Sequence, residues 1–230
     1  MGSNYKALMA YEVDLVFCID ATGSMDPILD TVKNNALNFY QDFKNAMDGK
    51  GKKVSQLRIR VVAFRDYYYD KDNAMMVTNF FNLPAMATDF EKCVKSITAD
   101  GGGDDPEDGL EALAYAMKSD WSKGATKKRH VIVVWSDDAT HDLGFGKSVP
   151  NYPKGMPSDF NELTEWWGTR KQPGFMDESA KRLLIFAPDK PGWSTIRENW
   201  NNVIHVETEA GTGLQDCEYS EILEVICNSI

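Results

Sequence analysis

The chain has 230 residues and a formal net charge of −10 at pH 7, from 25 Lys and Arg against 35 Asp and Glu. Its 43% hydrophobic and 26% charged residues are typical of a folded protein and exclude a largely disordered chain. No apolar stretch approaches twenty residues, so neither a membrane-spanning helix nor a membrane partner is expected. The surplus of carboxylates argues against a nucleic-acid partner and favours cations.

The length and the periodic pattern favour a single domain over residues 1–230, with residues 1–11 as an N-terminal extension. The N-terminus has no charged and apolar secretory leader, and the cysteines lack metal-site spacing. They are expected to be reduced thiols, with a disulfide between Cys217 and Cys227 as the alternative. These features predict a cytoplasmic protein and leave the oligomeric state open.

Short apolar runs of strand length recur along the chain, at residues 13–19, 57–64, 130–135, 182–187 and 202–206. A further run at 74–81 closely follows the second of these and is expected to form an antiparallel edge strand. Segments with helical spacing lie between the runs, including residues 28–47, 89–98, 107–118, 159–168 and 219–229. This alternation predicts an α/β fold with a mostly parallel central sheet and helices on both faces.

The longest irregular segment covers residues 143–157, and its Gly and Pro residues indicate a loop. Long loops inside compact domains tend to be functional. This loop closely follows the strand predicted at 130–135. We therefore expect it to lie next to any site at the ends of the strands and to contribute specificity.

The run VDLVFCIDATGSM, residues 13–25, ends a predicted strand on Asp20 and then places Thr22 and Ser24 at two-residue spacings. Three oxygen side chains on one tight loop suit Mg²⁺, which prefers oxygen ligands at about 2.1 Å and keeps some of its waters. A plainer interpretation is that these residues cap the helix expected to begin near Pro27. Capping leaves the acids at other strand ends unexplained.

In open α/β sheets, ligands bind beyond the carboxyl ends of the strands. Acidic residues follow two further predicted strands and one turn: Asp66, Asp104, Asp105, Glu107, Asp137 and Asp138. The acids at 104–107 also form a good helix start, because carboxylates favour the positive end of a helix dipole. We expect the oxygen ligands to collect at one rim of the sheet.

On these motifs the sequence resembles the von Willebrand factor A (VWA) domain family over nearly the whole chain. The resemblance implies a three-layer, Rossmann-like α-β-α fold and a metal-ion-dependent adhesion site (MIDAS). Members hold the ion with a DxSxS loop, matched here by Asp20, Thr22 and Ser24. The implied ion is Mg²⁺, with Mn²⁺ or Ca²⁺ as substitutes.

The other two loops of the family site are matched less uniformly. GGGDDPEDGLEAL resembles the acidic second loop of the integrin β subunit, which implies Glu107 as a ligand. In the third loop, a match to the Asp-Ala turn of related bacterial members favours Asp138, and a match to the commoner Thr-Asp-Gly turn favours Asp137. We take Asp138 as the ligand and Asp137 as the alternate.

The integrin β comparison also implies an adjacent Ca²⁺ site. Its ligands would be Asp66, Asp104, the carbonyl of Pro106 and a second oxygen of Glu107. The match is partial, because the integrin loop has an Asn before these ligands and this chain has Gly102 in its place.

The resemblance predicts a binding module without catalytic turnover. A divalent ion with an open position captures an Asp or Glu carboxylate of a partner protein. The predicted partner-contacting residues are Tyr67, His141, Trp166 and Trp167. The final segment resembles bacterial intracellular members, a likeness at the level of the fold alone.

Two other functions remain open from the sequence. One is a metal-dependent phosphohydrolase, although Thr22 stands where the DxDxT phosphatase motif has its second Asp. The other is a structural subunit whose ion only rigidifies the rim.

Overall fold

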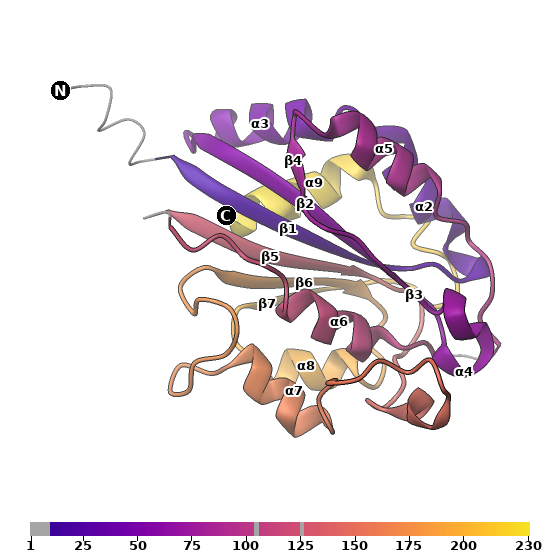
Figure 1. The fold of residues 1–230 in the computed structure, drawn as a ribbon. Coiled ribbons are helices and arrows are strands. Elements are labelled where there is room, and N and C mark those ends of the chain that lie inside the picture. Colours follow the sequence, from indigo (N-terminus) through magenta and orange to yellow (C-terminus); the bar gives the residue numbers. More distant parts are fainter. Residues whose placement is uncertain (1–9, 104–105, 125–126) are drawn as a thin grey trace.

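The computed structural model describes residues 10–103, 106–124 and 127–230. In these residues one sheet has the strand order β3, β2, β1, β5, β6, β7, with β4 also paired to β2 (Figure 1). The strands are β1 (Tyr11–Asp20), β2 (Val54–Phe64), β3 (Met75–Val77), β4 (Phe81–Leu83), β5 (Lys128–Trp135), β6 (Lys181–Ala187) and β7 (Val203–Glu207).

The five long strands pair in parallel, whereas β3 and β4 run antiparallel to β2. This confirms the predicted fold class. The edge segment predicted at 74–81 is two short strands rather than one, because residues 78–80 leave the ladder between β3 and β4.

The helices are α2 (Asp26–Asn35), α3 (Phe39–Gly49), α4 (Tyr67–Asp70), α5 (Ala87–Lys95), α6 (Gly109–Met117), α7 (Phe160–Trp167), α8 (Trp193–Asn199) and α9 (Tyr219–Ser229). Short 3₁₀ turns are η1 (Gly23–Met25), η2 (Lys71–Asn73) and η3 (Phe145–Ser148). The helical segment predicted at 28–47 is broken by a turn at 36–38. The turn leaves Leu37 half exposed and redirects the chain, so that Phe39 and Phe43 reach the core.

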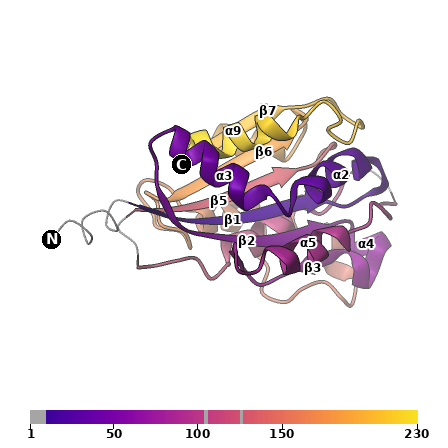
Figure 2. The same cartoon turned by 90° about the horizontal axis from the view of Figure 1, so that it is seen from above.

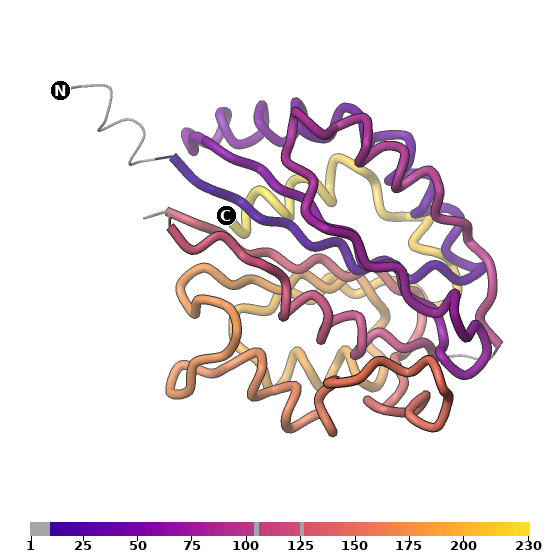
Figure 3. The backbone as a smooth tube through the Cα atoms, in the orientation of Figure 1, coloured from indigo at the N-terminus to yellow at the C-terminus, as the bar shows by residue number. Residues whose placement is uncertain are grey.

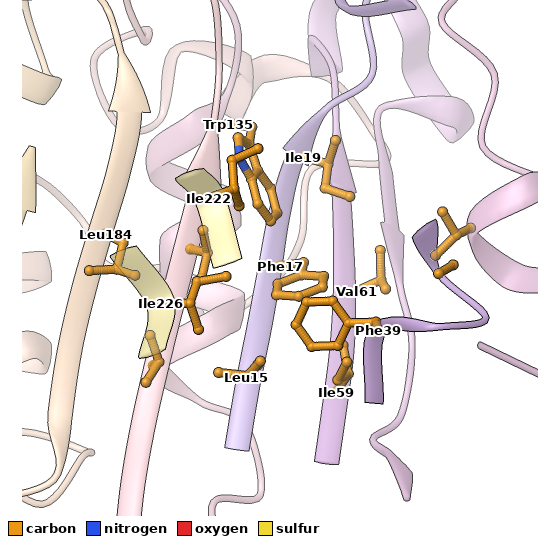
Figure 4. Packing of buried hydrophobic residues seen from close by; sticks show 14 of the residues in the cluster. Leu15, Phe17, Ile19, Phe39, Ile59, Val61, Trp135, Leu184, Ile222 and Ile226 are labelled. Carbon is orange, nitrogen blue, oxygen red and sulfur yellow. The ribbon is translucent and has the colours of Figure 1, made fainter. Parts of the chain in front are cut away.

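Alternate residues of the central strands supply two separate cores. On β1, Leu15, Phe17 and Ile19 face α2, α3, α5 and α9, while Val16 and Cys18 face α6, α7 and α8. Figure 4 shows the first core, and Figure 2 shows α2, α3 and α9 lying over the strands. Helices cover both faces, as a mostly parallel sheet requires.

The carboxyl ends of β1, β2 and β5 lie at the same edge of the sheet, as the backbone tube shows (Figure 3). The loops that leave this edge cover residues 21–25, 65–66 and 136–144. The segment that enters α6 and the loop after β7 also reach it, as their hydrogen bonds to these loops show. We call this edge the rim.

Within the described ranges, no helix has both the length and the apolar character needed to cross a membrane. All four cysteines are free thiols, so the alternative pairing of Cys217 with Cys227 is absent. Burial raises the pKa of the Cys227 thiol to about 11.

Candidate functional site

Asp20 ends β1 as a fully buried carboxylate at the centre of the rim. Its Oδ1 accepts hydrogen bonds from the backbone N–H of Thr22 at 3.0 Å and from the Thr22 hydroxyl at 2.7 Å. Its Oδ2 accepts one from the Ser136 hydroxyl at 2.9 Å, which links the loop after β1 to the loop after β5. Burial raises the pKa of Asp20 to about 6; the bonds from Thr22 oppose this rise, and the nearby charge of Asp137 adds to it.

Asp137 joins three loops that are far apart in the sequence. Its Oδ1 accepts a hydrogen bond from the Ser24 hydroxyl at 3.0 Å, and its Oδ2 accepts one from the Gly213 N–H at 2.9 Å. The backbone carbonyl of Asp137 accepts a further bond from Gly211 at 2.8 Å. Asp137 therefore ties Ser24 of the first loop to the loop after β7.

Asp138 has different partners from Asp137. Both of its carboxylate oxygens lie 2.8 Å from Nζ of Lys190, and Oδ1 also accepts the N–H of Ala139 at 2.6 Å. The sequence prediction preferred Asp138 as the ligand, with Asp137 as the alternate. The structure brings Asp137, rather than Asp138, next to Ser24.

Glu107 enters the rim from the segment before α6, with only 3% of its surface exposed. Its backbone carbonyl accepts bonds from the Thr140 hydroxyl at 3.0 Å and the His141 N–H at 2.9 Å. A Cβ atom placed on Gly102 would lie 2.7 Å from Oε1 of Glu107 and 3.1 Å from Cγ2 of Thr22. The Glu107 carboxylate and Thr22 therefore both lie against Gly102, whose φ of +75° suits glycine.

The electrostatics of this cluster favour a cation. Oε2 of Glu107 is buried and has no hydrogen-bond partner among the residues that the structure describes. Burial, followed by the charges of Asp20, Asp66 and Asp70, raises the pKa of Glu107 to about 10. A buried carboxylate that is not ion-paired is costly unless it is protonated or binds a metal.

The candidate ligand side chains around Asp20, which are those of Thr22, Ser24, Glu107 and Asp137, all offer oxygen atoms. Within the described residues, no three His, Cys, Asp or Glu side chains form a ready metal-binding group. Any ion here would therefore need the hydroxyls of Thr22 and Ser24 beside the carboxylates of Glu107 and Asp137. Such a mixed oxygen set fits Mg²⁺, Mn²⁺ or Ca²⁺ better than a softer metal.

The structure describes only some of the residues predicted to form the adjacent Ca²⁺ site. Asp66 is fully buried and caps α4 by accepting the amides of Tyr68 and Tyr69, the latter at 3.1 Å. Its Oδ2 lies 2.8 Å from Nε2 of His141. Asp104 lies outside the described residues, so the second site remains a prediction.

Two of the predicted partner-contacting residues lie near the rim but are buried. The ring of Tyr67 packs edge-on against Tyr152, with centroids 5.3 Å apart. His141 stacks on Phe145 at 3.8 Å. Exposed aromatic side chains beside them include Tyr68, at 53% exposure, Phe145, at 48%, and Tyr69, at 47%.

Trp166 and Trp167 lie away from the rim. Trp167 is fully buried, its indole donates to the carbonyl of Asn201 at 3.0 Å, and its own carbonyl accepts Nζ of Lys181, the first residue of β6. Trp166 lies beneath Nζ of Lys118 at 3.8 Å, just beyond the end of α6. These contacts are at the amino end of β6, opposite the rim.

Sequence reasoning did not predict several residues that build the rim. Ser136 orients Asp20, Lys190 pairs with Asp138, and Gly213 holds Asp137. The two glycines of AGTGL, with φ of +70° at Gly211 and +60° at Gly213, were a detectable signal for a tight loop. Nothing in the local sequence indicates where that loop docks.

Comparison with known proteins identifies related sequences. Residues 14–126 match a model of the von Willebrand factor A domain. The protein named Alpha-protein kinase vwkA from Dictyostelium discoideum is 30% identical over 155 residues, which cover 67% of this chain and 23% of that protein. The chain thus spans less than a quarter of the length of this curated relative.

Solved structures match over nearly the whole chain. The pilus adhesin SpaC from Lactobacillus rhamnosus GG has a TM-score of 0.54 at 12% identity, covering 95% of this chain and 30% of that one. A von Willebrand factor type A protein from Catenulispora acidiphila has a TM-score of 0.53 at 14% identity, covering 96% and 43%. At these identities the likeness concerns the fold alone.

Proposed function

We propose that this chain, whose family-model match and solved neighbours support the von Willebrand factor A domain family, is a divalent-metal-dependent protein-binding module. The proposed ion is Mg²⁺, which Mn²⁺ or Ca²⁺ can replace. Thr22, Ser24, Glu107 and Asp137 hold it, and Asp20 takes part directly or through a water. Asp137 replaces Asp138 in this set, because Asp137 is bonded to Ser24.

The observation that carries the proposal is the environment of the Glu107 carboxylate. Its buried Oε2 has no partner in residues 10–103, 106–124 and 127–230, and the charge of Asp20 contributes to the raised pKa of Glu107. The hydroxyl-bearing Thr22 lies against the same glycine as Glu107. A cation at this point would satisfy the orphan oxygen and neutralise the repulsion between the carboxylates.

The ion would recognise a carboxylate of the partner protein. Two hydroxyls and a few carboxylates leave a divalent ion with water-filled positions, one of which an Asp or Glu can take. Tyr68 and Phe145, whose ring centroids are 6.3 Å apart, supply exposed aromatic surface for the residues beside that acid. Tyr67, Trp166 and Trp167 are not part of this proposed surface.

The proposed role is binding rather than catalysis. The relative named as a kinase matches this chain over less than a quarter of its own length, so its activity is not carried over. Among the described residues of the rim, no contact favours the phosphohydrolase alternative. A purely structural ion is the remaining alternative, and a partner-binding experiment separates it from the proposal.

The experiment compares wild type with Asp20→Ala in two assays. Calorimetry with Mg²⁺ and Mn²⁺ should give a binding isotherm for wild type and none for the variant. Affinity capture from the native host should then retain a protein only with wild type and Mg²⁺, and EDTA should release it. Metal binding without metal-dependent capture would support the structural ion, and no metal binding in wild type would refute the proposal.

A further inference from the structure

Glu111 lies in the first turns of α6 and is fully buried, although most of its neighbours in that helix are apolar. Its Oε1 accepts two hydrogen bonds, from the Gly144 N–H at 2.8 Å and from the Tyr152 hydroxyl at 2.8 Å. Its Oε2 is buried and has no partner within the described part of the chain. The two partners of Glu111 both belong to the 143–157 loop.

The position of Glu111 has no evident role in the core itself. The flanking residues Leu110, Ala112 and Leu113 pack in the second core, where an apolar side chain would avoid the penalty of burying a carboxylate. Both bonds made by Glu111 instead reach across to the loop. A buried acceptor with two well-placed donors from one loop fixes that loop relative to its own helix.

The segment from Thr140 to Tyr152 is therefore held at two points by the start of α6. The Glu107 carbonyl binds Thr140 and His141, and four residues later Glu111 binds Gly144 and Tyr152. Between the two Glu111 contacts, a Cβ on Gly146 would lie 2.6 Å from Cβ of Tyr67, so this part of the loop lies directly on α4. Figure 1 shows the loop running beside α4 and α6.

Phe145 lies between the two residues that Glu111 holds. Its ring stacks on His141 at 3.8 Å and leaves 48% of the residue exposed beside Tyr68. The exposed aromatic surface next to the metal residues thus depends on how the loop is held. A free loop would present Phe145 in many positions, and ordering it on binding would weaken affinity.

We propose that Glu111 is the positioning residue of the partner-recognition loop: its Oε1, which accepts bonds from both Gly144 and Tyr152, fixes residues 143–157 so that Phe145 lies beside the metal rim. The statement that this loop meets the partner rests on the proposed function. The statement that Glu111 fixes the loop is independent of the proposed function.

The test is hydrogen exchange followed by mass spectrometry on the full chain. It compares wild type with Glu111→Leu, which removes both bonds, and with Glu111→Gln, whose carbonyl oxygen can still accept them. Tyr152→Phe removes one bond and keeps the ring on Tyr67. Tyr152→Phe takes the place of Glu111→Leu in the comparison if Glu111→Leu fails to fold. Calorimetry with Mn²⁺ is run on every variant.

Exchange in peptides covering 142–152 should rise about tenfold or more in Glu111→Leu, rise less in Tyr152→Phe, and stay near wild type in Glu111→Gln. Peptides from β1 and β5 should stay protected, and Mn²⁺ affinity should stay within about twofold, because Glu111 is not a metal ligand. Unchanged loop exchange in Glu111→Leu, or in Tyr152→Phe if the first variant unfolds, would overturn the proposal. Absence of Mn²⁺ binding in wild type would instead refute the proposed function and leave the exchange result to decide the role of Glu111.

Discussion

Asp137 and Asp138 are neighbours in the sequence, yet their carboxylates contact different residues. Asp137 accepts bonds from Ser24 and Gly213, whereas Asp138 is paired with Lys190. A motif match cannot separate two adjacent acids, because the choice depends on the direction in which the loop after β5 turns. Lys190, the partner of Asp138, lies about fifty residues away in the chain.

The pair gives a matched test of ligand identity. Asp137→Asn should weaken Mn²⁺ binding by at least about tenfold, because a charged ligand becomes a neutral one. Asp138→Asn should leave Mn²⁺ affinity nearly unchanged and reduce stability by at most about 1 kcal/mol, since its ion pair is partly exposed. Calorimetry and thermal unfolding measure both. The reverse pattern would support Asp138 as the ligand.

At the scale of elements, the periodic apolar runs predicted the five parallel strands and most helices. These elements bury whole faces, so their residue spacing carries the signal. The sequence did not predict α8, nor the break between α2 and α3. Both depend on how Trp193 and Phe39 dock on different faces of the sheet, which is a tertiary property.

The loop after β7 is the element that sequence reasoning most underestimated. Gly213→Ala should lower stability by about 1–3 kcal/mol and weaken Mn²⁺ binding, because its φ is +60° and a Cβ would lie 2.0 Å from the carbonyl oxygen of Ser24. Gly211→Ala is the control: its φ is +70°, but no atom of a described residue lies within 4 Å of its Cβ. Equal losses of Mn²⁺ affinity in the two variants would contradict the docking role of Gly213.

At the scale of the whole molecule, carboxylates from distant parts of the chain are brought together in one buried group. The charges of Asp20 and Asp66 both contribute to the raised pKa of Glu107. The sequence shows that acids follow several strands. It could therefore predict that these acids meet, because a parallel sheet places the carboxyl ends of its strands at one edge. It could not predict that Oε2 of Glu107 would be buried without a hydrogen-bond partner among the described residues, nor that Asp66 would cap α4 and contact His141.

This cluster predicts how stability varies with pH. The folded pKa of Glu107 is about 10, above the ordinary value of 4.5, so its protonated form is stabilised by folding. That contribution is complete below about pH 4.5 and is lost as the pH rises toward about 10. In EDTA, wild type should therefore lose more stability from pH 5 to pH 9 than Glu107→Gln, as urea unfolding measures.

Divalent ions should reverse that trend. Because binding releases the proton from Glu107, stabilisation by Mg²⁺ should increase with pH in wild type and be reduced in Glu107→Gln. Parallel pH dependences for the two proteins in EDTA would contradict the assignment of Glu107 as a buried, raised-pKa carboxylate.

The most direct measurement is an anomalous difference map from a crystal of the chain soaked in Mn²⁺. The account predicts one strong peak at the rim, within about 2.0–2.4 Å of oxygen atoms of Thr22, Ser24, Glu107 and Asp137 and close to Asp20. A well-diffracting crystal with no peak there, or with its main peak at Asp138 or elsewhere, would contradict it.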